Sequence, residues 1–432
     1  MRSTDSMQSP RSALLLMFAY HFPPENAIGG ARPFRFAKNL SRLGVPLHVF
    51  TAADVSARPD LNAETVIDPF VSKPRCGIGW QAERAIRKFF LPGATGSQWA
   101  VNSYKAACRF LASQPLTQSD YKRPIVFSTY PPLGTALAGY WLAKRRGLRW
   151  ILDFRDPMGD NPSDKHLSGF QKAIYCYLER KFVRAADCVV ANTDAAQARL
   201  RNKFPELADN ISLLWNGFDP EQRLGPLPVP ARTKRVYSHV GELYEGRIIT
   251  PLLLSIDRLI RTGRLSPADF LIQLIGSVRS TSVPDTAFMT EATNKGWLRV
   301  VSEHLPQAEA HRIMQESDGL VLVQPHSTLQ VPGKLFEYVP IGRPILAYIP
   351  TETPIERILR QSNIPCTFAY SSGGDEFLDS AVLSFFKLDH RAVKPSKWFE
   401  DVFNAERQAD QLLQLINQLE KGSPASTMAQ VA

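Results

Sequence analysis

Residues 331–350, which read VPGKLFEYVPIGRPILAYIP, constrain the fold more than any other stretch of this chain. Backbone breakers open the segment, a helical pattern begins at Lys334, and Gly-Arg-Pro then leads into an apolar run typical of a buried strand. A helix that returns directly into a buried strand is half of a βαβ unit, from which parallel sheets are built. The segment therefore predicts an α/β domain with a parallel sheet.

Lys334 and Glu337 are three residues apart, so on a helix they share one face near its N-terminal end. That end of a helix favours anions, and a lysine there suits a diphosphate. A carboxylate one turn deeper accepts hydrogen bonds from the two hydroxyls of a ribose. The pair predicts a nucleotide-diphosphate site. The alternative, which holds for most isolated K-x-x-E patterns, is a surface ion pair on an amphipathic helix.

The rest of the chain continues the alternation of short apolar runs with helical patterns, and so predicts an α/β protein throughout. At 432 residues the chain is too long for one core, and 44% hydrophobic with 21% charged residues is a globular composition. A proline-rich stretch separates two halves. We expect a first domain over 1–219, a linker over 220–232, a second domain over 233–395, an amphipathic helix over 396–421 and a flexible tail over 422–432.

A glycine pair, Gly29 and Gly30, lies between the strand predicted over 12–20 and a helix predicted over 31–43. We expect the pair to end a loop. Such a turn lets backbone N–H groups approach a ligand at the carboxyl edge of a parallel sheet, although as a plain turn it would be unremarkable. The pattern is not G-x-G-x-x-G, which argues against a nicotinamide or flavin enzyme.

The motif D-F-R-D, with Asp153, Arg155 and Asp156, follows a strand predicted over 148–152, and Pro157 ends it. Charged groups at the carboxyl end of a parallel strand lie where this fold class binds ligands. Two carboxylates near one arginine predict a catalytic or acceptor-positioning role for the three residues. The alternative is a buried ion pair that holds the loop.

The second domain opens with a strand predicted over 235–240 and a turn, GELYEGR, that begins at Gly241 and ends at Arg247. A guanidinium is a strong ligand for phosphate, so the arginine is a candidate phosphate-binding residue.

The run G-K-L-F-E-Y followed by G-R-P-I-L-A resembles the nucleotide-sugar segment of the retaining glycosyltransferases of family 4, in the GT-B superfamily. The resemblance implies that Lys334 and Leu335 lie near the donor phosphates and that Glu337 binds the donor ribose. Many members carry another glutamate eight positions earlier, where this chain has Leu329. Contacts to the donor sugar are therefore not carried over.

The resemblance extends over most of the chain, including the double glycine, the D-F-R-D motif and the N-G-x-D turn that ends the first half. It implies two Rossmann-like domains with a cleft between them and a last helix that packs back on the first domain. It places Gly29 and Gly30 near the donor phosphates and acceptor, and Gly241 and Arg247 on the diphosphate. The family's usual arginine after the first glycine is replaced by Glu242.

The charge of the chain is uneven: residues 1–220 carry 29 lysines and arginines against 18 aspartates and glutamates, and the remainder carry 22 against 23. A basic first half suggests an anionic membrane surface or a lipid-linked phosphate acceptor, and residues 69–113 interleave aromatic and basic side chains. The alternatives are solubility charge and an ordinary core-facing helix. No nucleic-acid motif accompanies the charge, so we expect no nucleic-acid partner.

Five widely spaced cysteines without CxxC indicate neither a disulfide framework nor zinc, and no apolar run is long enough to span a membrane. We expect a cytoplasmic protein, or one peripheral to the inner face of the cytoplasmic membrane.

The predicted function is transfer of a sugar from a nucleotide-diphosphate sugar to a carbohydrate or lipid-linked acceptor in cell-surface polysaccharide synthesis, with retention implied by the resemblance. No D-x-D motif is present, so we expect no metal and no cofactor besides the substrate. Two alternatives are a nucleotide-sugar epimerase of similar fold and a non-catalytic polysaccharide-assembly protein.

Overall fold

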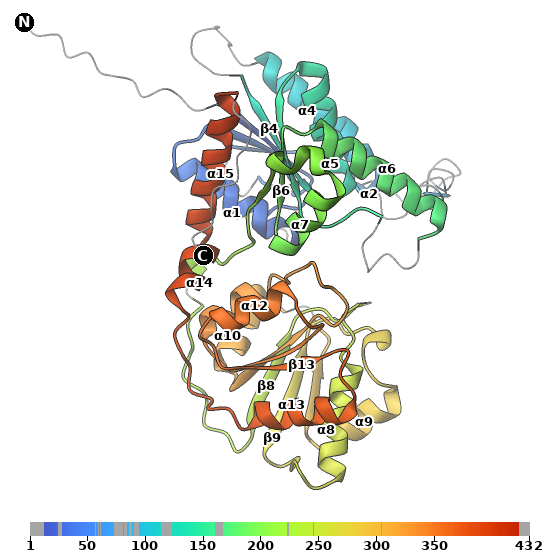
Figure 1. The fold of residues 1–432 in the computed structure, drawn as a ribbon, viewed down its shortest axis with the longest axis vertical. Coiled ribbons are helices and arrows are strands. Elements are labelled where there is room, and N and C mark those ends of the chain that lie inside the picture. Colours follow the sequence, from blue (N-terminus) through green and yellow to red (C-terminus); the bar gives the residue numbers. More distant parts are fainter. Residues whose placement is uncertain are drawn as a thin grey trace, which may run out of the picture. The chain divides into compact units, whose positions relative to one another are not determined.

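The structure is a computed structural model that describes residues 13–24, 28–56, 58, 60, 62–72, 81, 84–85, 89, 95–113, 123–159, 167–222, 224–244, 246–303 and 305–422. The chain divides into two compact units. The first comprises residues 1–215 and 405–432, and the second comprises residues 216–404. Each unit is an α/β layer structure with its own sheet (Figure 1).

The described part of the first unit contains a seven-stranded parallel sheet in the order β3-β2-β1-β4-β5-β6-β7. Its strands are β1 (Leu15–Phe18), β2 (Leu47–Thr51), β3 (Ala63–Thr65), β4 (Ile125–Tyr130), β5 (Arg149–Phe154), β6 (Cys188–Ala191) and β7 (Ile211–Leu213). The strand order reverses after β3: β2 and β3 are added on one side of β1, and β4 and the later strands are added on its other side. In doubly wound sheets, ligands bind outside the carboxyl ends of the strands at such a reversal.

Helices cover both faces of this sheet because its strands are apolar on both sides. In β1, Leu16 and Phe18 point into one core, whereas Leu15 and Met17 point into the other. The helices of this unit are α1 (Ile28–Arg42), α2 (Pro69–Ser72), α4 (Ser97–Ser113), α5 (Leu133–Arg146), α6 (Gly169–Ala185), α7 (Asp194–Lys203), the 3₁₀ turn η1 (Pro205–Asn210) and α15 (Ala405–Glu420). Figure 1 shows α1 and α15 side by side on one face.

The second unit has a six-stranded parallel sheet in its described residues, in the order β10-β9-β8-β11-β12-β13. Its strands are β8 (Arg235–Val240), β9 (Phe270–Ile275), β10 (Leu298–Val301), β11 (Gly319–Val323), β12 (Ile345–Ile349) and β13 (Cys366–Tyr370). Its helices are α8 (Thr250–Arg261), α9 (Thr286–Asn294), α10 (Gln307–Glu316), α11 (Leu335–Ile341), α12 (Pro354–Gln361), α13 (Asp375–Phe386) and α14 (Lys397–Phe403), with 3₁₀ turns η2 (Pro220–Gln222) and η3 (Ser280–Ser282).

The structure divides the chain at other points than the sequence predicts. The first unit ends at Trp215, because the N–H of Phe218 donates to the carbonyl of Phe403 in the second unit. The predicted linker is partly packed on that unit as well: the N–H of Leu227 donates to the carbonyl of Gln315. Residues after 215 therefore take their conformation from the second unit.

The single helix predicted over 396–421 is instead two helices. Asn404 takes an extended conformation that ends α14, and α15 begins at the next residue. Phe399 and Phe403 of α14 pack against Phe336 in the second unit, whereas Leu412 and its apolar neighbours on α15 lie in a core of the first unit. Burial against two different units overrides the continuous helical pattern.

Gly29 and Gly30 also differ from expectation, because they lie inside the first turn of α1 rather than in a loop.

No helix in the described residues is both long and apolar enough to cross a membrane. Most of the aromatic and basic stretch near residues 73–94 lies outside the described residues, as do the polar lead and nearly all of the predicted tail.

Candidate functional site

Two glycines bring the ends of β8 and β9 into direct contact at the carboxyl edge of the second sheet. Gly241 follows β8 with a φ of 128°, and Gly276 follows β9 with a φ of 114°. A β-carbon on Gly276 would lie 2.9 Å from the carbonyl carbon of Gly241. Only glycine fits such a conformation at such a separation. The result is a stretch of bare backbone at the edge where parallel sheets bind ligands.

Lys334 lies at the start of α11 and places its ammonium over this bare backbone, since a β-carbon on Gly241 would overlap its Nζ. The Nζ is buried, and no hydrogen-bond partner reaches it within the described residues. Burial, followed by the charge of Arg247, lowers the pKa of Lys334 to about 7. A buried donor without an acceptor is costly, which suggests that an anion supplies the missing acceptor.

Arg247 supplies the second cation of this edge. Its guanidinium carbon lies 4.8 Å from the ring centroid of Tyr244, and its Nε donates to Gln324 Oε1 at 3.2 Å. These contacts fix the plane of the guanidinium, and no carboxylate in the part of the chain that the structure describes forms an ion pair with it. Glu242, which replaces the family's usual arginine, lies 4.0 Å from Arg279 instead.

Glu337 occupies the first turn of α11 and is partly exposed. Its Oε1 lies 3.7 Å from Nε2 of His311 on α10. Leu335 is placed differently: its side chain is fully buried, and its N–H donates to the carbonyl of Pro332. The structure therefore brings Gly241, Arg247 and Lys334 together with Glu337 one turn away, and leaves the Leu335 side chain in the core.

His239 lies under the same edge and was not singled out by the sequence. Its ring is buried in β8, and its Nδ1 lies 2.9 Å from the carbonyl of Val321. A carbonyl only accepts, so Nδ1 carries the proton, and Nε2 is a buried acceptor to which no described residue donates a hydrogen bond. Burial and the nearby Lys334 hold the pKa of His239 well below its ordinary value. Two neighbouring groups with unsatisfied hydrogen-bonding capacity thus lie behind Gly241.

In the first unit, Asp153 forms a buried ion pair with Arg32 of α1. The two side chains are 2.9 Å apart, and Thr129 donates to the same carboxylate at 2.8 Å. Arg32 also donates to the carbonyls of Leu214 and Trp215. The partner of Asp153 is therefore Arg32 rather than the Arg155 that the motif suggested.

Arg155 connects three segments at the carboxyl edge of the first sheet. It donates to the carbonyls of Gly29, at 2.9 Å, and of Pro131. A β-carbon on Gly29 would lie 3.3 Å from the ring of His21 and 3.7 Å from Arg155, so the glycine allows this approach. Burial lowers the pKa of Arg155, whereas the two aspartates of the motif raise it. Arg155 thus holds the start of α1 against the strand ends.

Glu179 supports the loop after D-F-R-D and was missed from the sequence. It is fully buried on α6, accepts from the N–H of Met158 at 2.8 Å, and pairs with Lys203 at 2.6 Å and Arg199 at 3.4 Å. A signal existed, since Tyr175, Glu179 and Phe182 share the buried face of an amphipathic pattern. A charged residue on an apolar face predicts a buried ionic partner.

Among the residues that the structure describes, no cluster of three or more histidine, cysteine, aspartate or glutamate side chains is arranged to hold a metal ion.

Comparison with known proteins yields one family and a set of similar folds. Residues 29–217 match the model of the glycosyl transferase 4-like domain. Among curated proteins, none matches the sequence significantly. The family match confirms the predicted resemblance.

Three solved structures illustrate the fold. Anabaena HepE in complex with UDP and glucose has a TM-score of 0.57 at 12% identity, over 94% of this chain and 100% of that one. The catalytic domain of Arabidopsis thaliana starch synthase IV, bound to ADP and acarbose, has a TM-score of 0.56 at 12% identity, over 95% and 100%. A putative UDP-N-acetylglucosamine 2-epimerase from Listeria monocytogenes has a TM-score of 0.52 at 10% identity, over 96% and 99%. The predicted two-sheet fold is confirmed by these similarities.

Proposed function

Since the chain has the GT-B fold and contains a glycosyl transferase 4-like domain, we propose that it is a glycosyltransferase that uses a nucleotide-diphosphate sugar as donor. The observation that carries the proposal is the buried ammonium of Lys334, which lies over the bare backbone of Gly241 and has no hydrogen-bond partner among the described residues. Arg247 is close enough to lower the pKa of that lysine. Two like charges beside a glycine-lined sheet edge are stabilised by a diphosphate between them.

The same two cations give the proposed site its chemistry. Glycosyl transfer breaks the bond between the anomeric carbon and the diphosphate oxygen, and forms a bond to an acceptor hydroxyl, whose proton is lost. Negative charge therefore develops on the departing diphosphate, where Lys334 and Arg247 act as fixed counter-charges. Glu337 accepts from the ribose hydroxyls in this proposal, and the partial exposure of its carboxylate leaves it accessible.

On the acceptor side, we assign the carboxyl edge of the first sheet. Asp156 is only half-buried, so we assign it to the acceptor hydroxyl, whereas Arg155 shapes the edge through Gly29. Asp153 acts through Arg32, because its carboxylate is fully buried. The acceptor proposed is a carbohydrate or lipid-linked molecule in cell-surface polysaccharide synthesis, and retention follows the family resemblance.

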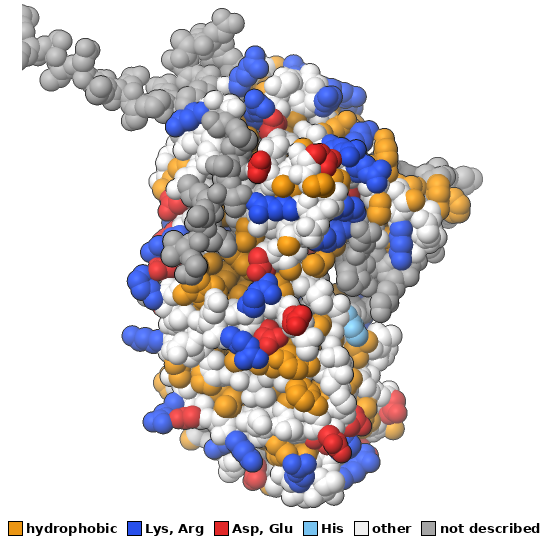
Figure 2. All heavy atoms as spheres, in the orientation of Figure 1, with side chains coloured by type: hydrophobic (Ala, Val, Ile, Leu, Met, Phe, Trp, Pro, Cys, Tyr) orange, Lys and Arg blue, Asp and Glu red, His pale blue; other side chains and the backbone are white. Residues whose placement is uncertain are grey.

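A membrane-facing role rests on the surface of the first unit. Phe89, Phe170 and Tyr177 are exposed aromatic residues, and Lys181 lies 5.8 Å from the ring of Tyr177. On the face shown in Figure 2, the blue side chains of lysine and arginine are prominent in this unit. Aromatic rings beside cations suit the interface of an anionic membrane. We therefore propose that the protein is cytoplasmic and binds the inner face of the cytoplasmic membrane.

The donor proposal is tested by calorimetric titration of UDP, GDP, TDP and ADP, and then of their sugars. One nucleotide should bind selectively to the wild type, and Glu337→Ala should weaken it at least tenfold. Glu309→Ala, which removes an exposed glutamate of α10 in the same unit, is the matched control and should bind as the wild type does. If no nucleotide binds, or if both variants bind equally, the donor site is misassigned.

An activity assay with the nucleotide sugar that binds separates the remaining hypotheses. The similarity to the Listeria protein favours testing an epimerase, which would convert the donor sugar without an acceptor. A glycosyltransferase should require the acceptor for release of the nucleotide. If the nucleotide sugar binds but neither reaction occurs, the remaining hypothesis is a non-catalytic polysaccharide-assembly protein.

A further inference from the structure

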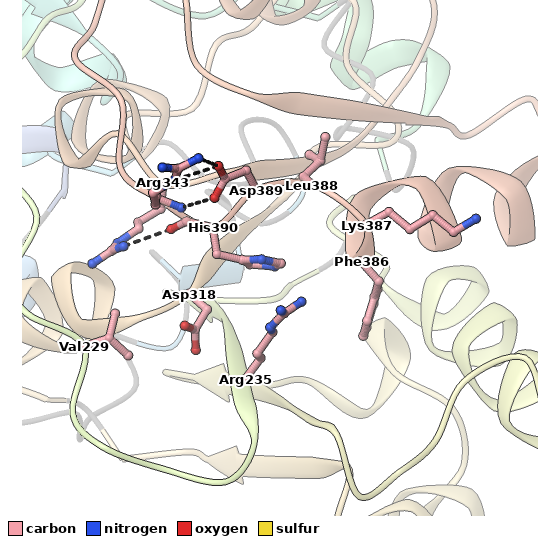
Figure 3. A pocket seen from close by; sticks show the side chains of 10 residues that line it. Val229, Arg235, Asp318, Arg343, Phe386, Lys387, Leu388, Asp389 and His390 are labelled. Atoms are coloured by element: carbon pink, nitrogen blue, oxygen red, sulfur yellow. Dashed lines mark hydrogen bonds and ion pairs between the residues drawn. The ribbon is translucent and has the colours of Figure 1, made fainter.

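A second recess opens at the amino edge of the sheet in the second unit, away from the candidate donor site (Figure 3). Its volume is about 540 Å³, which is sufficient for a small organic ligand. Arg235 is the first residue of β8, whereas Gly241 follows its last residue. At about 3.3 Å per residue, the strand separates the two places by roughly 20 Å. One ligand of ordinary size cannot occupy both.

The recess carries more positive than negative charge. Its lining includes the cations Arg235, Arg343, Lys387 and Arg391, against two aspartates. Both aspartates already have partners, since Asp389 pairs with Arg391 at 2.6 Å and Asp318 with Arg232 at 2.6 Å.

For the other three cations, no carboxylate lies within ion-pairing distance in the part of the chain that the structure describes. Lys387 extends away from the centre of the recess in Figure 3, so the cations within it that have no ion pair among the described residues are Arg235 and Arg343.

Arg343 forms a rigid part of the wall. It is 8% exposed, and its Nη atoms donate to the carbonyls of His390, at 3.0 Å, and Leu227, at 2.9 Å. Its Nε is buried and has no hydrogen-bond partner among the residues that the structure describes. Burial lowers the pKa of Arg343, and the nearby charge of Asp318 opposes this shift only in part. A buried donor on a fixed cation is a feature that favours an anion in the recess.

Arg235 and His390 extend toward one another in Figure 3. His390 Nε2 lies 2.8 Å from the hydroxyl of buried Tyr237, which orients the imidazole. Burial and the nearby Arg235 lower the pKa of His390, so its ring is neutral at pH 7 and adds a polar contact without a charge. Phe386 supplies an apolar wall, with its ring 4.8 Å from that of Tyr237. Two cations, a neutral imidazole and a phenyl ring match a phosphate on a small organic body.

We propose that this recess is a second binding site, for a small phosphate monoester, that is separate from the donor site. The phosphate contacts Arg235 and the organic part lies toward Phe386. Arg343 positions the loop that carries His390 and contributes its charge from the wall.

The test is calorimetric titration with inorganic phosphate and with glycerol 3-phosphate. Both titrations use the full chain carrying Lys334→Met and Arg247→Ala, which remove the cations of the donor site. This protein should bind one equivalent of glycerol 3-phosphate, more tightly than inorganic phosphate. Adding Arg235→Gln, which removes an exposed charge at a strand end, should weaken binding at least tenfold. Arg299→Ala, at an exposed position of β10, is the matched control and should change binding less than twofold.

Absence of binding in the parent protein, or equal binding after Arg235→Gln and Arg299→Ala, would overturn the proposal. Thermal unfolding of each variant checks that its fold is intact. Titrating nucleotides into the variant that carries only Arg235→Gln tests whether the recess and the donor site are separate. Unchanged nucleotide affinity is expected, because the donor site lies at the other edge, whereas a matching loss would show that the recess is not a separate site.

Discussion

Gly241 and Lys334 share one small volume at the end of β8. The space that a side chain on Gly241 would fill is occupied by the ammonium of Lys334, and the φ of 128° at Gly241 is itself one that side chains rarely adopt. The absence of a side chain at one residue thus determines where the charge of the other lies. This relationship makes the proposed donor site sensitive to a single added methyl group.

Gly241→Ala should therefore affect both stability and binding. The strained backbone should reduce the free energy of unfolding by about 1–3 kcal/mol, and displacement of Lys334 should weaken nucleotide binding at least tenfold. Gly263→Ala is the matched control, because Gly263 has a φ of 69° but no atom within 4 Å of its β-carbon position. Chemical denaturation and calorimetry measure both quantities. Nucleotide affinity that is equal in the two variants would contradict the role of this contact.

Lys334 should make the ligand-free protein less stable at low pH. Its folded pKa of about 7 lies below the ordinary value of 10.5, so between these values the unfolded state binds more protons and stability rises with pH. Below pH 7 the full penalty for the buried charge applies. Lys334→Met should therefore stabilise the protein at pH 6 by on the order of 2–5 kcal/mol, and by much less near pH 10. Urea unfolding at both pH values measures this; a gain that is independent of pH would refute it.

Nucleotide-diphosphate binding should weaken as pH rises above 7. A bound diphosphate favours the charged form of Lys334, so binding takes up a proton wherever the free lysine is neutral. The dissociation constant should increase by up to about tenfold per pH unit over this range. Titrations in buffers of different ionisation enthalpy report the proton uptake directly. Lys334→Met should bind more weakly and without that uptake, and an equal uptake by the variant would assign the proton to another group.

The two aspartates of D-F-R-D should respond differently to removal of their charge. Asp153→Asn leaves the buried guanidinium of Arg32 without its counter-charge and should reduce stability by about 3–5 kcal/mol. Asp156 is half-buried, so Asp156→Asn should reduce stability by less than about 1 kcal/mol, and it should lower transfer activity because the proposal assigns this residue to the acceptor. Combining Arg32→Met with Asp153→Leu should recover much of the lost stability, because no charge is then left unpaired. If Asp153→Asn and Asp156→Asn reduced the free energy of unfolding equally, the proposed difference between the two aspartates would be wrong.

The sequence by itself determined the order and type of most elements. The strand predicted over 235–240 has those same bounds in β8, and the strands predicted over 12–20 and 148–152 correspond to β1 and β5 with shifted ends. Short apolar runs are local patterns, and their length together with the flanking turn residues indicates strands that are buried on both faces of a parallel sheet. The residues of the proposed donor site were also singled out from the sequence: Lys334 and Glu337 by their spacing at a predicted helix start, and Gly241 and Arg247 by the turn after a predicted strand.

Only the tertiary structure decided which of these residues meet. Asp153 pairs with Arg32, 121 residues earlier in the chain, although Arg155 is two residues away. The helical pattern over 396–421 breaks at Asn404 because its two parts are buried in different units. Periodicity states which face of an element is buried, but the order of strands in the sheets decides what that face contacts. For that reason the sequence could predict a positive charge on Lys334 at the donor site. Only the tertiary structure shows that its ammonium is buried over Gly241 and has no hydrogen-bond partner among the described residues.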